Sequence, residues 1–302
     1  MRRSLPVLLA AGLLLLTACG SQAGGPRAAV APSGTSACGV PIGGSPSVRP
    51  GSPSERERDG VRITGIGPAC AEFEVTNRES EPLSYTVTFT HLSASGAAQS
   101  TSTETVPAVA PGRTVGGTVA RAGMAAGSGG TGRVAIATVR SVPTAESSEP
   151  GVCPPSGMRV SADRGDAAMG LRAVGLHLEN CGTGTVELNG YPELQVVGQD
   201  HKPVDGVQIL HGGSAISTGA GADDPPRPLA LKPGERAYAG LVWRNTVELG
   251  QADPVNAPYL RVRAKAGAAP VMVVPELDLG TTGRLGVGAW TVDRSPVAPA
   301  RP

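Results

Sequence analysis

Apolar and polar side chains alternate at every second position through much of residues 61–142. The segments 72–75 and 85–90 follow this pattern without interruption, the second with threonine at each polar position. Period-two alternation places the apolar side chains on one face of a β-strand. Because turn signals separate these runs, the pattern predicts an antiparallel β-sandwich. The turn signals are Gly96, Pro111-Gly112 and a glycine-rich stretch over 123–132.

The alternation resumes in the second half of the chain. Val174, Leu176 and Leu178 share one face of a predicted strand, while His177 lies on the other. A second antiparallel sandwich is therefore expected, with Trp243 in its core, and no amphipathic helix is expected in either half. Further strands are predicted over 186–197, 237–243, 259–264, 271–274 and 277–292.

The two halves share two local signals. Each has a strand that ends in asparagine, at Asn77 and at Asn180, and each has a later Pro-Gly turn, at Pro111-Gly112 and at Pro233-Gly234. A common architecture explains these signals without duplication and favours an immunoglobulin-like fold for both halves. The predicted fold class is all-β, with two tandem immunoglobulin-like antiparallel β-sandwiches.

The first twenty residues have a different pattern. Arg2 and Arg3 precede an apolar run over 5–16 that is too short to span a bilayer, which takes about 20 residues, and that fits a secretory signal. The run ends in Leu16-Thr17-Ala18-Cys19, which resembles the lipobox of bacterial lipoproteins. That resemblance implies cleavage before Cys19 and a lipid on its sulfur, and the alternative is an ordinary signal with a chance cysteine. No other segment is apolar enough to cross a membrane.

Low-complexity segments set the expected domain organisation. A stretch rich in Gly, Ser, Pro and Ala follows the signal, and a Pro/Ser/Glu stretch over 143–155 separates the two sandwiches. The predicted parts are a lipoprotein signal peptide over 1–18, lipidated Cys19 with a disordered tether over 19–59, an N-terminal sandwich over 60–142, a linker over 143–152, a C-terminal sandwich over 153–293 and a disordered tail over 294–302.

Composition narrows the possible partners. The chain has 43 Gly and 28 Pro in 302 residues and only 3% aromatic residues, which indicates many turns and a core of aliphatic side chains. The formal net charge is +1, with no basic run long enough to follow a phosphate backbone. Nucleic acid is therefore not an expected partner.

Four cysteines remain besides Cys19, an even number that predicts disulfides in an exported protein. Four cysteines allow three pairings. Joining neighbours gives Cys38–Cys70 and Cys153–Cys181, so that each bridge stabilises one domain by roughly 3–4 kcal/mol. A metal or redox site is the weaker alternative, because the chain has no Cys-x-x-Cys motif.

Candidate chemistry is sparse. A metal site built from His201 and His211 with Asp205 or Asp223 is conceivable, but the chain has no His-Glu-x-x-His motif, and neither Gly-x-Ser-x-Gly nor Ser-x-x-Lys is present. We predict no catalytic, cofactor-binding or metal-binding residue and no cofactor. The loop 211–227 is the strongest candidate for recognition, since long loops on sandwiches often bind partners. Its alternative is a flexible connection in a glycine-rich chain.

Five short motifs occur in a fixed order in the second half: Cys153-Pro154, the strand 174–180, Leu188-Asn189-Gly190-Tyr191-Pro192, Leu231-Lys232-Pro233-Gly234-Glu235 and Leu241-Val242-Trp243. In this order they resemble a domain of unknown function found in actinobacterial secreted lipoproteins, the one numbered forty-two thirty-two. The resemblance implies an extracytoplasmic β-sandwich and no particular reaction.

The chain departs from that family at one cysteine. Family members often carry a cysteine five residues before the tyrosine of Gly-Tyr-Pro, where this chain has Val186, and Cys181 lies five residues earlier still. The bridge from Cys153 to Cys181 can therefore differ in geometry from the family's bridge.

The expected function is that of a non-catalytic binding or interaction module on the outer face of the cell membrane. Its expected partners are the membrane, through lipid on Cys19, and an unknown envelope protein, glycan or small molecule. The alternatives are an envelope enzyme or metal-handling protein that uses the loop 211–227 and its nearby His and Asp residues, and a purely structural spacer.

Overall fold

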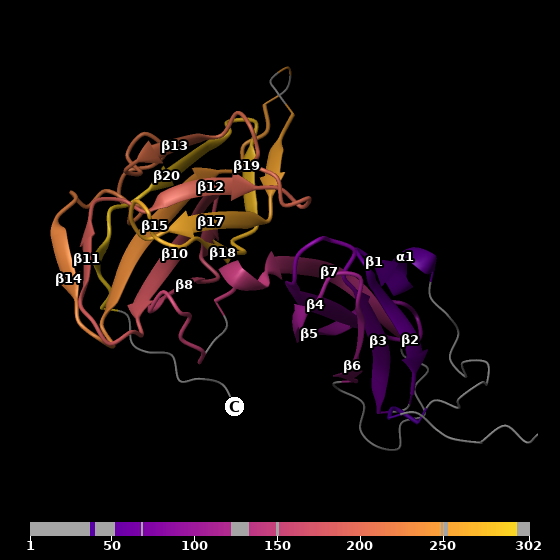
Figure 1. The fold of residues 1–302 in the computed structure, drawn as a ribbon. Coiled ribbons are helices and arrows are strands. Elements are labelled where there is room, and N and C mark those ends of the chain that lie inside the picture. The colour runs from indigo at the N-terminus through magenta and orange to yellow at the C-terminus, as the bar shows by residue number, and fades with distance from the viewer. Residues whose placement is uncertain are drawn as a thin grey trace, which may run out of the picture. The chain divides into compact units, whose positions relative to one another are not determined.

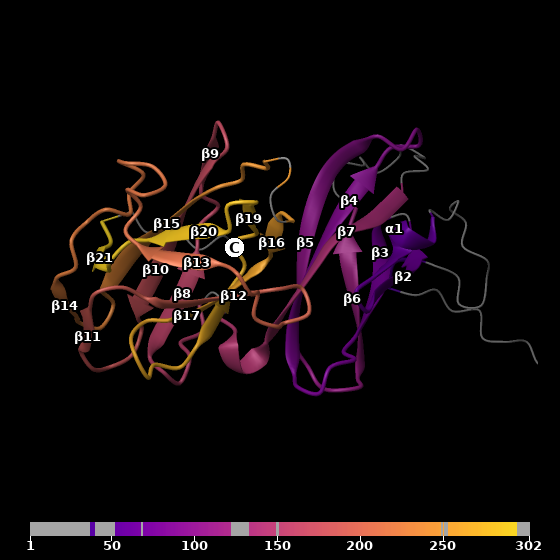
Figure 2. The same ribbon diagram turned by 90° about the horizontal axis from the view of Figure 1, so that it is seen from above.

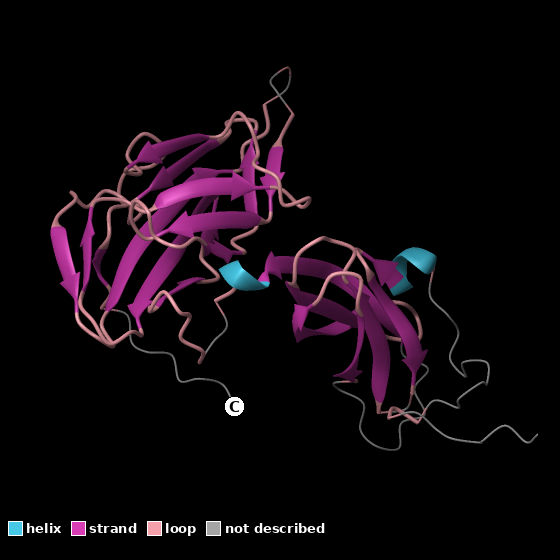
Figure 3. Cartoon of the chain, viewed as in Figure 1, coloured by secondary structure: helices cyan, strands magenta, loops and turns pink. Residues whose placement is uncertain are grey.

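The structure is a computed structural model that describes residues 37–39, 52–67, 69–121, 133–148, 151–248, 250 and 253–294. The predicted signal peptide, Cys19 and residues 295–302 lie outside these ranges. The described chain is almost entirely β (Figures 1 and 3). Its helices are one four-residue helix, α1 (Pro53–Arg56), and one 3-10 turn, η1 (Thr144–Glu146). The predicted all-β fold class is confirmed.

The N-terminal sandwich consists of two antiparallel sheets. One sheet has the order β1-β2-β3-β6, and the other has the order β5-β4-β7. The core between them is aliphatic apart from Tyr85 and a pair of phenylalanines, Phe73 and Phe89, whose ring centroids lie 5.0 Å apart. The strands are β1 (Glu57–Arg58), β2 (Val61–Ile66), β3 (Cys70–Thr76), β4 (Leu83–Leu92), β5 (Ala98–Val109), β6 (Thr114–Ala120) and β7 (Arg133–Pro143).

The expected tether over 19–59 is too long at its C-terminal end. Helix α1 and strand β1 occupy its last residues, and Cys38 is buried. At the start of α1, the Ser52 N–H donates to the Glu55 carboxylate at 2.7 Å, which is one half of a capping box. Pro53 occupies the first helical position, where its missing N–H costs nothing. The Pro and Ser residues that suggested disorder therefore start a helix.

The C-terminal sandwich has a seven-stranded sheet on one side of its core. Its main order is β13-β20-β15-β10-β8, with β9 paired to β10 and β21 paired to β15 (Figure 2). All of its pairs are antiparallel except β13 with β20, which is parallel. The strands are β8 (Met158–Ala162), β9 (Asp166–Ala168), β10 (Leu171–Asn180), β13 (Gln208–His211), β15 (Arg236–Arg244), β20 (Arg284–Val287) and β21 (Thr291–Val292).

Smaller sheets complete this sandwich. β12 (Glu193–Val197), β17 (Tyr259–Arg263) and β18 (Val271–Val273) form one sheet, β11 (Val186–Asn189) pairs with β14 (Pro228–Leu231), and β16 (Val255–Ala257) pairs with β19 (Leu277–Gly280). The strand expected over 186–197 is therefore two strands in different sheets. The chain turns between them at Gly190, whose φ of 93° strongly favours glycine.

Both tryptophans belong to the C-terminal core, as expected for Trp243. Each is only 2% exposed. The Trp243 indole N–H donates to Asp278 at 2.7 Å, and the Trp290 indole N–H donates to the Ala264 carbonyl at 2.8 Å. Burial of these rings is favourable because each polar N–H keeps a hydrogen-bond partner.

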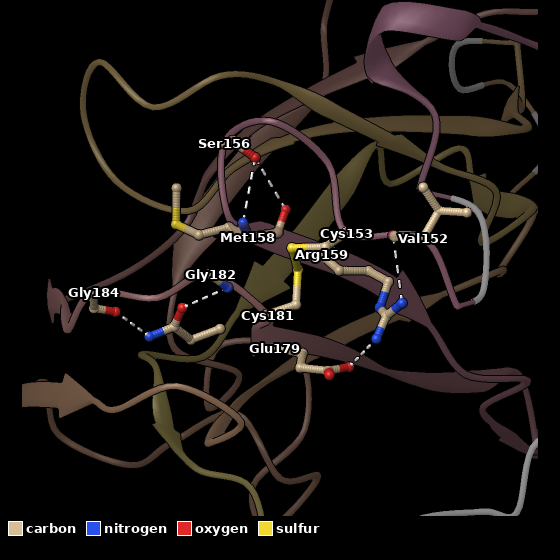
Figure 4. Close-up of a disulfide and its surroundings, with 10 residues drawn as sticks. Val152, Cys153, Ser156, Met158, Arg159, Glu179, Cys181, Gly182 and Gly184 are labelled. Atoms are coloured by element: carbon tan, nitrogen blue, oxygen red, sulfur yellow. Dashed lines mark hydrogen bonds and ion pairs between the residues drawn. A yellow bond between two sulfur atoms is a disulfide. The ribbon is translucent and has the colours of Figure 1, made fainter.

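Two disulfides join neighbouring cysteines along the chain, as predicted: Cys38 to Cys70 and Cys153 to Cys181. The second bridge ties the segment that leads into β8 to the end of β10 (Figure 4). Beside it, Arg159 of β8 and Glu179 of β10 form an ion pair at 2.6 Å. The metal alternative for these four cysteines is therefore wrong.

A buried asparagine closes the same corner of each sandwich. In the first, the Asn77 amide donates to the carbonyls of Glu81 and Val109, both at 2.8 Å, and its oxygen accepts from the Glu79 N–H at 2.9 Å. The side chain is completely buried, and its bond to the Val109 carbonyl is shielded from water.

Asn180 makes the corresponding set of bonds in the second sandwich. Its amide donates to the carbonyls of Gly184 and Leu231, both at 2.8 Å, and its oxygen accepts from the Gly182 N–H at 3.1 Å. It is also completely buried. The sequence signal shared by the two halves therefore corresponds to a shared hydrogen-bonded corner.

Candidate functional site

The shared corner aligns the strands of the two sandwiches and identifies what the second one adds. β3 pairs with β6 as β10 pairs with β15, and the Asn77 and Asn180 N–H groups donate to Arg113 and Glu235, the residues that follow the two Pro-Gly turns. β5 then corresponds to β14. Residues 93–97 connect β4 to β5, whereas residues 198–227, which include β13, separate β12 from β14. The second sandwich therefore carries a long additional segment, and additions to a scaffold are where function often resides.

The loop 211–227, at the end of that segment, lies directly on the outer face of the seven-stranded sheet. Glycines allow this close approach: Gly240 of β15 lies against the carbonyl of Gly221, and a Cβ atom on Gly286 of β20 would lie 2.8 Å from the Gly212 carbonyl oxygen. Ala222, in the middle of the loop, is 1% exposed. The loop backbone thus takes the place of side chains on this face.

Hydrogen bonds fix the same loop. The Gly212 N–H donates to the Val287 carbonyl at 2.7 Å, and the Gly213 N–H donates to the Asp223 carboxylate at 2.8 Å. The two ends of the loop are therefore joined to each other and to the sheet, and Asp223 has a structural role within the loop.

A cavity of about 760 Å³ lies between the end of this loop and the C-terminal end of the sandwich. We call it the loop pocket. Ligand-binding pockets commonly have volumes of about 300–1,000 Å³. Its wall contains both rigid apolar and charged side chains, so the pocket can hold an apolar body and a charged group together. The lining residues are Asp224, Pro225, Arg227, Pro228, Leu229, Tyr238, Trp290, Thr291, Val292, Asp293 and Arg294.

A charged network underlies one side of the loop pocket. His177 lies between two carboxylates, with Nδ1 2.8 Å from Asp293 and Nε2 3.3 Å from Asp163. The Arg236 guanidinium lies 3.9 Å from the same Asp293 oxygen. The Asp293 side chain is only 1% exposed, and these partners compensate for the burial of its polar oxygens.

Tyr238 adds a phenol to the pocket wall. Its ring lies edge-on to His177, with centroids 5.5 Å apart. Burial, together with the carboxylates of Asp163 and Asp293, raises the pKa of Tyr238 above its usual value. The phenol therefore keeps its proton at neutral pH and can donate a hydrogen bond.

The residues proposed for a metal site do not come together. His201 Nε2 lies 2.8 Å from the Ser141 carbonyl oxygen, and the His211 ring stacks on Tyr191 with centroids 4.1 Å apart. Within the ranges that the structure describes, no three His, Cys, Asp or Glu side chains form a group that could hold a metal ion.

Sequence reasoning identified the loop but missed the other wall of the pocket. Arg294 was assigned to a disordered tail, although it lines the pocket next to Asp293. The sequence around Arg294 gives little indication of this position, because it does not show that the last described residues return to the sheet beside β15. The pairing of Ala237 and Tyr238 with β21 brings them there.

Comparisons with known proteins bear mainly on the C-terminal sandwich. Residues 153–291 match the family model described as Domain of unknown function (DUF4232). This supports the predicted domain resemblance. No curated protein matches the chain.

Among solved structures, the chain is similar to the crystal structure of red sea bream transglutaminase, with 10% identity and a TM-score of 0.19. The alignment covers 80% of this chain and 30% of that one, so the chain spans under a third of the transglutaminase. A likeness of this size indicates neither a shared fold nor a shared activity.

Proposed function

We propose that this protein is an extracytoplasmic lipoprotein, held by lipid on Cys19 to the outer face of the cell membrane, whose C-terminal sandwich binds a component of the cell envelope without transforming it. The observation that carries the binding proposal is the loop pocket, a cavity of about 760 Å³ beside a loop whose ends are hydrogen-bonded. A preformed site binds more tightly than a flexible one because less conformational freedom is lost on binding.

The anchor proposal rests on the first nineteen residues. Arg2 and Arg3, the short apolar run and the sequence before Cys19 together match a lipoprotein signal. In the described part of the chain, no helix is long and apolar enough to cross a membrane. Two or more acyl chains on Cys19 would give stable anchoring. We also propose that the chain is one of the actinobacterial secreted lipoproteins whose C-terminal motifs it resembles.

The chemistry of the pocket favours binding over catalysis. Its lining residues include no serine, cysteine or histidine. Of its two hydroxyl side chains, Thr291 already donates to the Tyr238 carbonyl at 3.3 Å. A nucleophile needs a base within hydrogen-bond reach, and the lining offers no such pair. The partner is accordingly a ligand, which can belong to an envelope protein, a glycan or a small molecule, and not a substrate.

Crosslinking in intact cells tests the binding proposal. A photo-crosslinking amino acid at Val292, which is 54% exposed and lines the pocket, should capture an envelope component. The same group at Val247, which is 60% exposed and outside the pocket, is the matched control and should not capture it. Equal capture from both positions, or none from either, would refute the proposal.

Cell fractionation tests the anchor. The Cys19→Ala variant should be released into the medium or remain unprocessed, because it has no sulfur to carry the lipid. Tight membrane retention of a processed Cys19→Ala protein would show that something other than the lipid holds it.

A further inference from the structure

Two arginines of the loop pocket lack a counter-ion. Arg227 and Arg294 both line the cavity and both are exposed. Neither has a hydrogen bond or ion pair with another residue in the described ranges. By contrast, Arg159 on the same sheet face is paired with Glu179 at 2.6 Å. Both guanidinium groups are therefore available to a ligand in the cavity.

The carboxylates near the pocket do not neutralise these arginines. Asp293 is turned into the network below, where His177 and Arg236 approach the same oxygen and only 1% of the side chain is exposed. Asp224 is the single other carboxylate of the lining, and it is exposed to solvent. With Asp293 held in that network, the pocket presents two guanidinium groups and the one carboxylate of Asp224 to a ligand, an excess of one positive charge.

Building on the proposed function, we infer that the loop pocket binds an organic anion, a phosphate ester or a carboxylate, with Arg227 and Arg294 holding the oxyanion. The guanidinium group presents a planar fork of donors that matches two oxygens of either anion. The Tyr238 phenol is a further donor in the same wall. Either ligand would carry an oxyanion joined to an apolar group of about the size of one ring.

The size and composition of the cavity favour a ligand that has an apolar group beside its anion. About 760 Å³ is far more than a single phosphate or carboxylate fills. Pro225, Pro228 and Leu229 form one apolar wall, and Val292 lies on the C-terminal side. Rings of proline lose little freedom on binding, so they suit a flat or cyclic ligand. An inorganic anion would leave these surfaces uncovered.

Titration calorimetry of the full-length, detergent-solubilised protein tests the inference with four probes: phenyl phosphate, benzoate, inorganic phosphate and phenol. Phenyl phosphate should bind more tightly than inorganic phosphate, because it also covers the apolar wall, and phenol should bind at least tenfold more weakly than phenyl phosphate. Comparing phenyl phosphate with benzoate decides between a phosphate and a carboxylate. Binding of the anions should weaken with added salt.

Charge-removing variants locate the site. Arg227→Gln and Arg294→Gln should each weaken phenyl phosphate binding by about tenfold to a hundredfold, as expected for the loss of one charge-assisted contact. Arg113→Gln, at an exposed arginine of the N-terminal sandwich, is the matched control and should leave binding unchanged. All three positions are exposed, so the variants should fold, and a thermal melt checks this.

The results separate the ligand class from the proposed function. Phenol binding as tight as phenyl phosphate binding, or anion binding unaffected by both pocket variants, would overturn the inference. Capture of an envelope component by the crosslinker at Val292, both when phenyl phosphate is present and when Arg227 is replaced by Gln, would support the binding function and overturn the anion assignment. Loss of capture in the presence of phenyl phosphate would support both the binding function and the anion assignment.

Discussion

Replacing Gly286 by alanine should lift the loop 211–227 from the sheet. A Cβ atom at this position would lie 2.8 Å from the Gly212 carbonyl oxygen, 2.9 Å from a Val242 methyl carbon and 3.2 Å from the Gly213 Cα. Carbon atoms in favourable contact are about 3.5–4.0 Å apart, so the new methyl group overlaps its neighbours by roughly half an ångström or more. Two of these neighbours are backbone atoms, which cannot rotate away.

The size of the effect follows from two opposed contributions. Overpacking a filled site costs about 1–3 kcal/mol, whereas replacing glycine by alanine inside a strand gains roughly 0.5–1 kcal/mol. The net loss in free energy of unfolding should be about 1–2 kcal/mol. For a domain of this size, that corresponds to a fall in Tm of roughly 3–6 °C. The loop should move and the strand should not, because β20 is bonded to strands on both sides.

Calorimetry and amide exchange together measure this. Gly286→Ala should lower Tm and speed exchange of the Gly212 and Gly213 amides, and it should weaken any ligand of the loop pocket. Gly184→Ala is the matched control, because a Cβ there meets nothing within 4 Å. An unchanged Tm with unchanged exchange in Gly286→Ala would show that the loop is not held by this close approach.

Three further predictions concern stability. Asn180→Ala should lower the free energy of unfolding in urea by roughly 2–4 kcal/mol, because three backbone groups, among them the buried Leu231 carbonyl, lose their partner. Asn77→Ala should cost a similar amount, and a loss below about 0.5 kcal/mol in either variant would contradict the stabilising role of the shared corner. Joint replacement of Cys153 and Cys181 by serine should cost about 3–4 kcal/mol, since the bridge closes a separation of 28 residues. Burial, with the nearby Glu79 carboxylate and Tyr259, raises the pKa of Tyr85 to about 12. Because this lies above its unfolded value of about 10, the stability it contributes below pH 10 should be lost as the pH rises towards 12. Denaturation at pH 9 and pH 11 measures this loss, which Tyr85→Phe should reduce.

The strands were predictable wherever one face of a strand is buried and the other meets solvent. Phe73 and Val75 point inward while Glu72 and Glu74 do not, and the observed burial of β3 alternates accordingly. Where both faces are covered, the burial no longer alternates, although β15 (Arg236–Arg244) agrees closely with the strand predicted over 237–243. In β15, the five residues from Ala239 to Trp243 are all buried, since the core covers one face and the loop 211–227 covers the other.

Short elements were missed for a different reason. Helix α1 depends on the capping interaction between Ser52 and Glu55, and the Pro and Ser residues around it suggested a disordered tether. The turn at Gly190 divides one expected strand into two, although nothing in the apolar pattern breaks there. Local hydrogen bonds and single backbone angles decide such boundaries, and residue patterns carry little information about them.

The sequence by itself determined the β architecture and the signal shared by the two halves, and it favoured the pairing of neighbouring cysteines and the loop 211–227 as a candidate for recognition. These properties depend on residues close together in the chain or on a repeating alternation. Only the tertiary structure decided that Arg227 and Arg294 line one cavity, that His177 lies between Asp163 and Asp293, and that glycines on β15 and β20 make room for the loop. These contacts join residues far apart in sequence, so they follow from strand order and register, which a pattern along the chain does not specify.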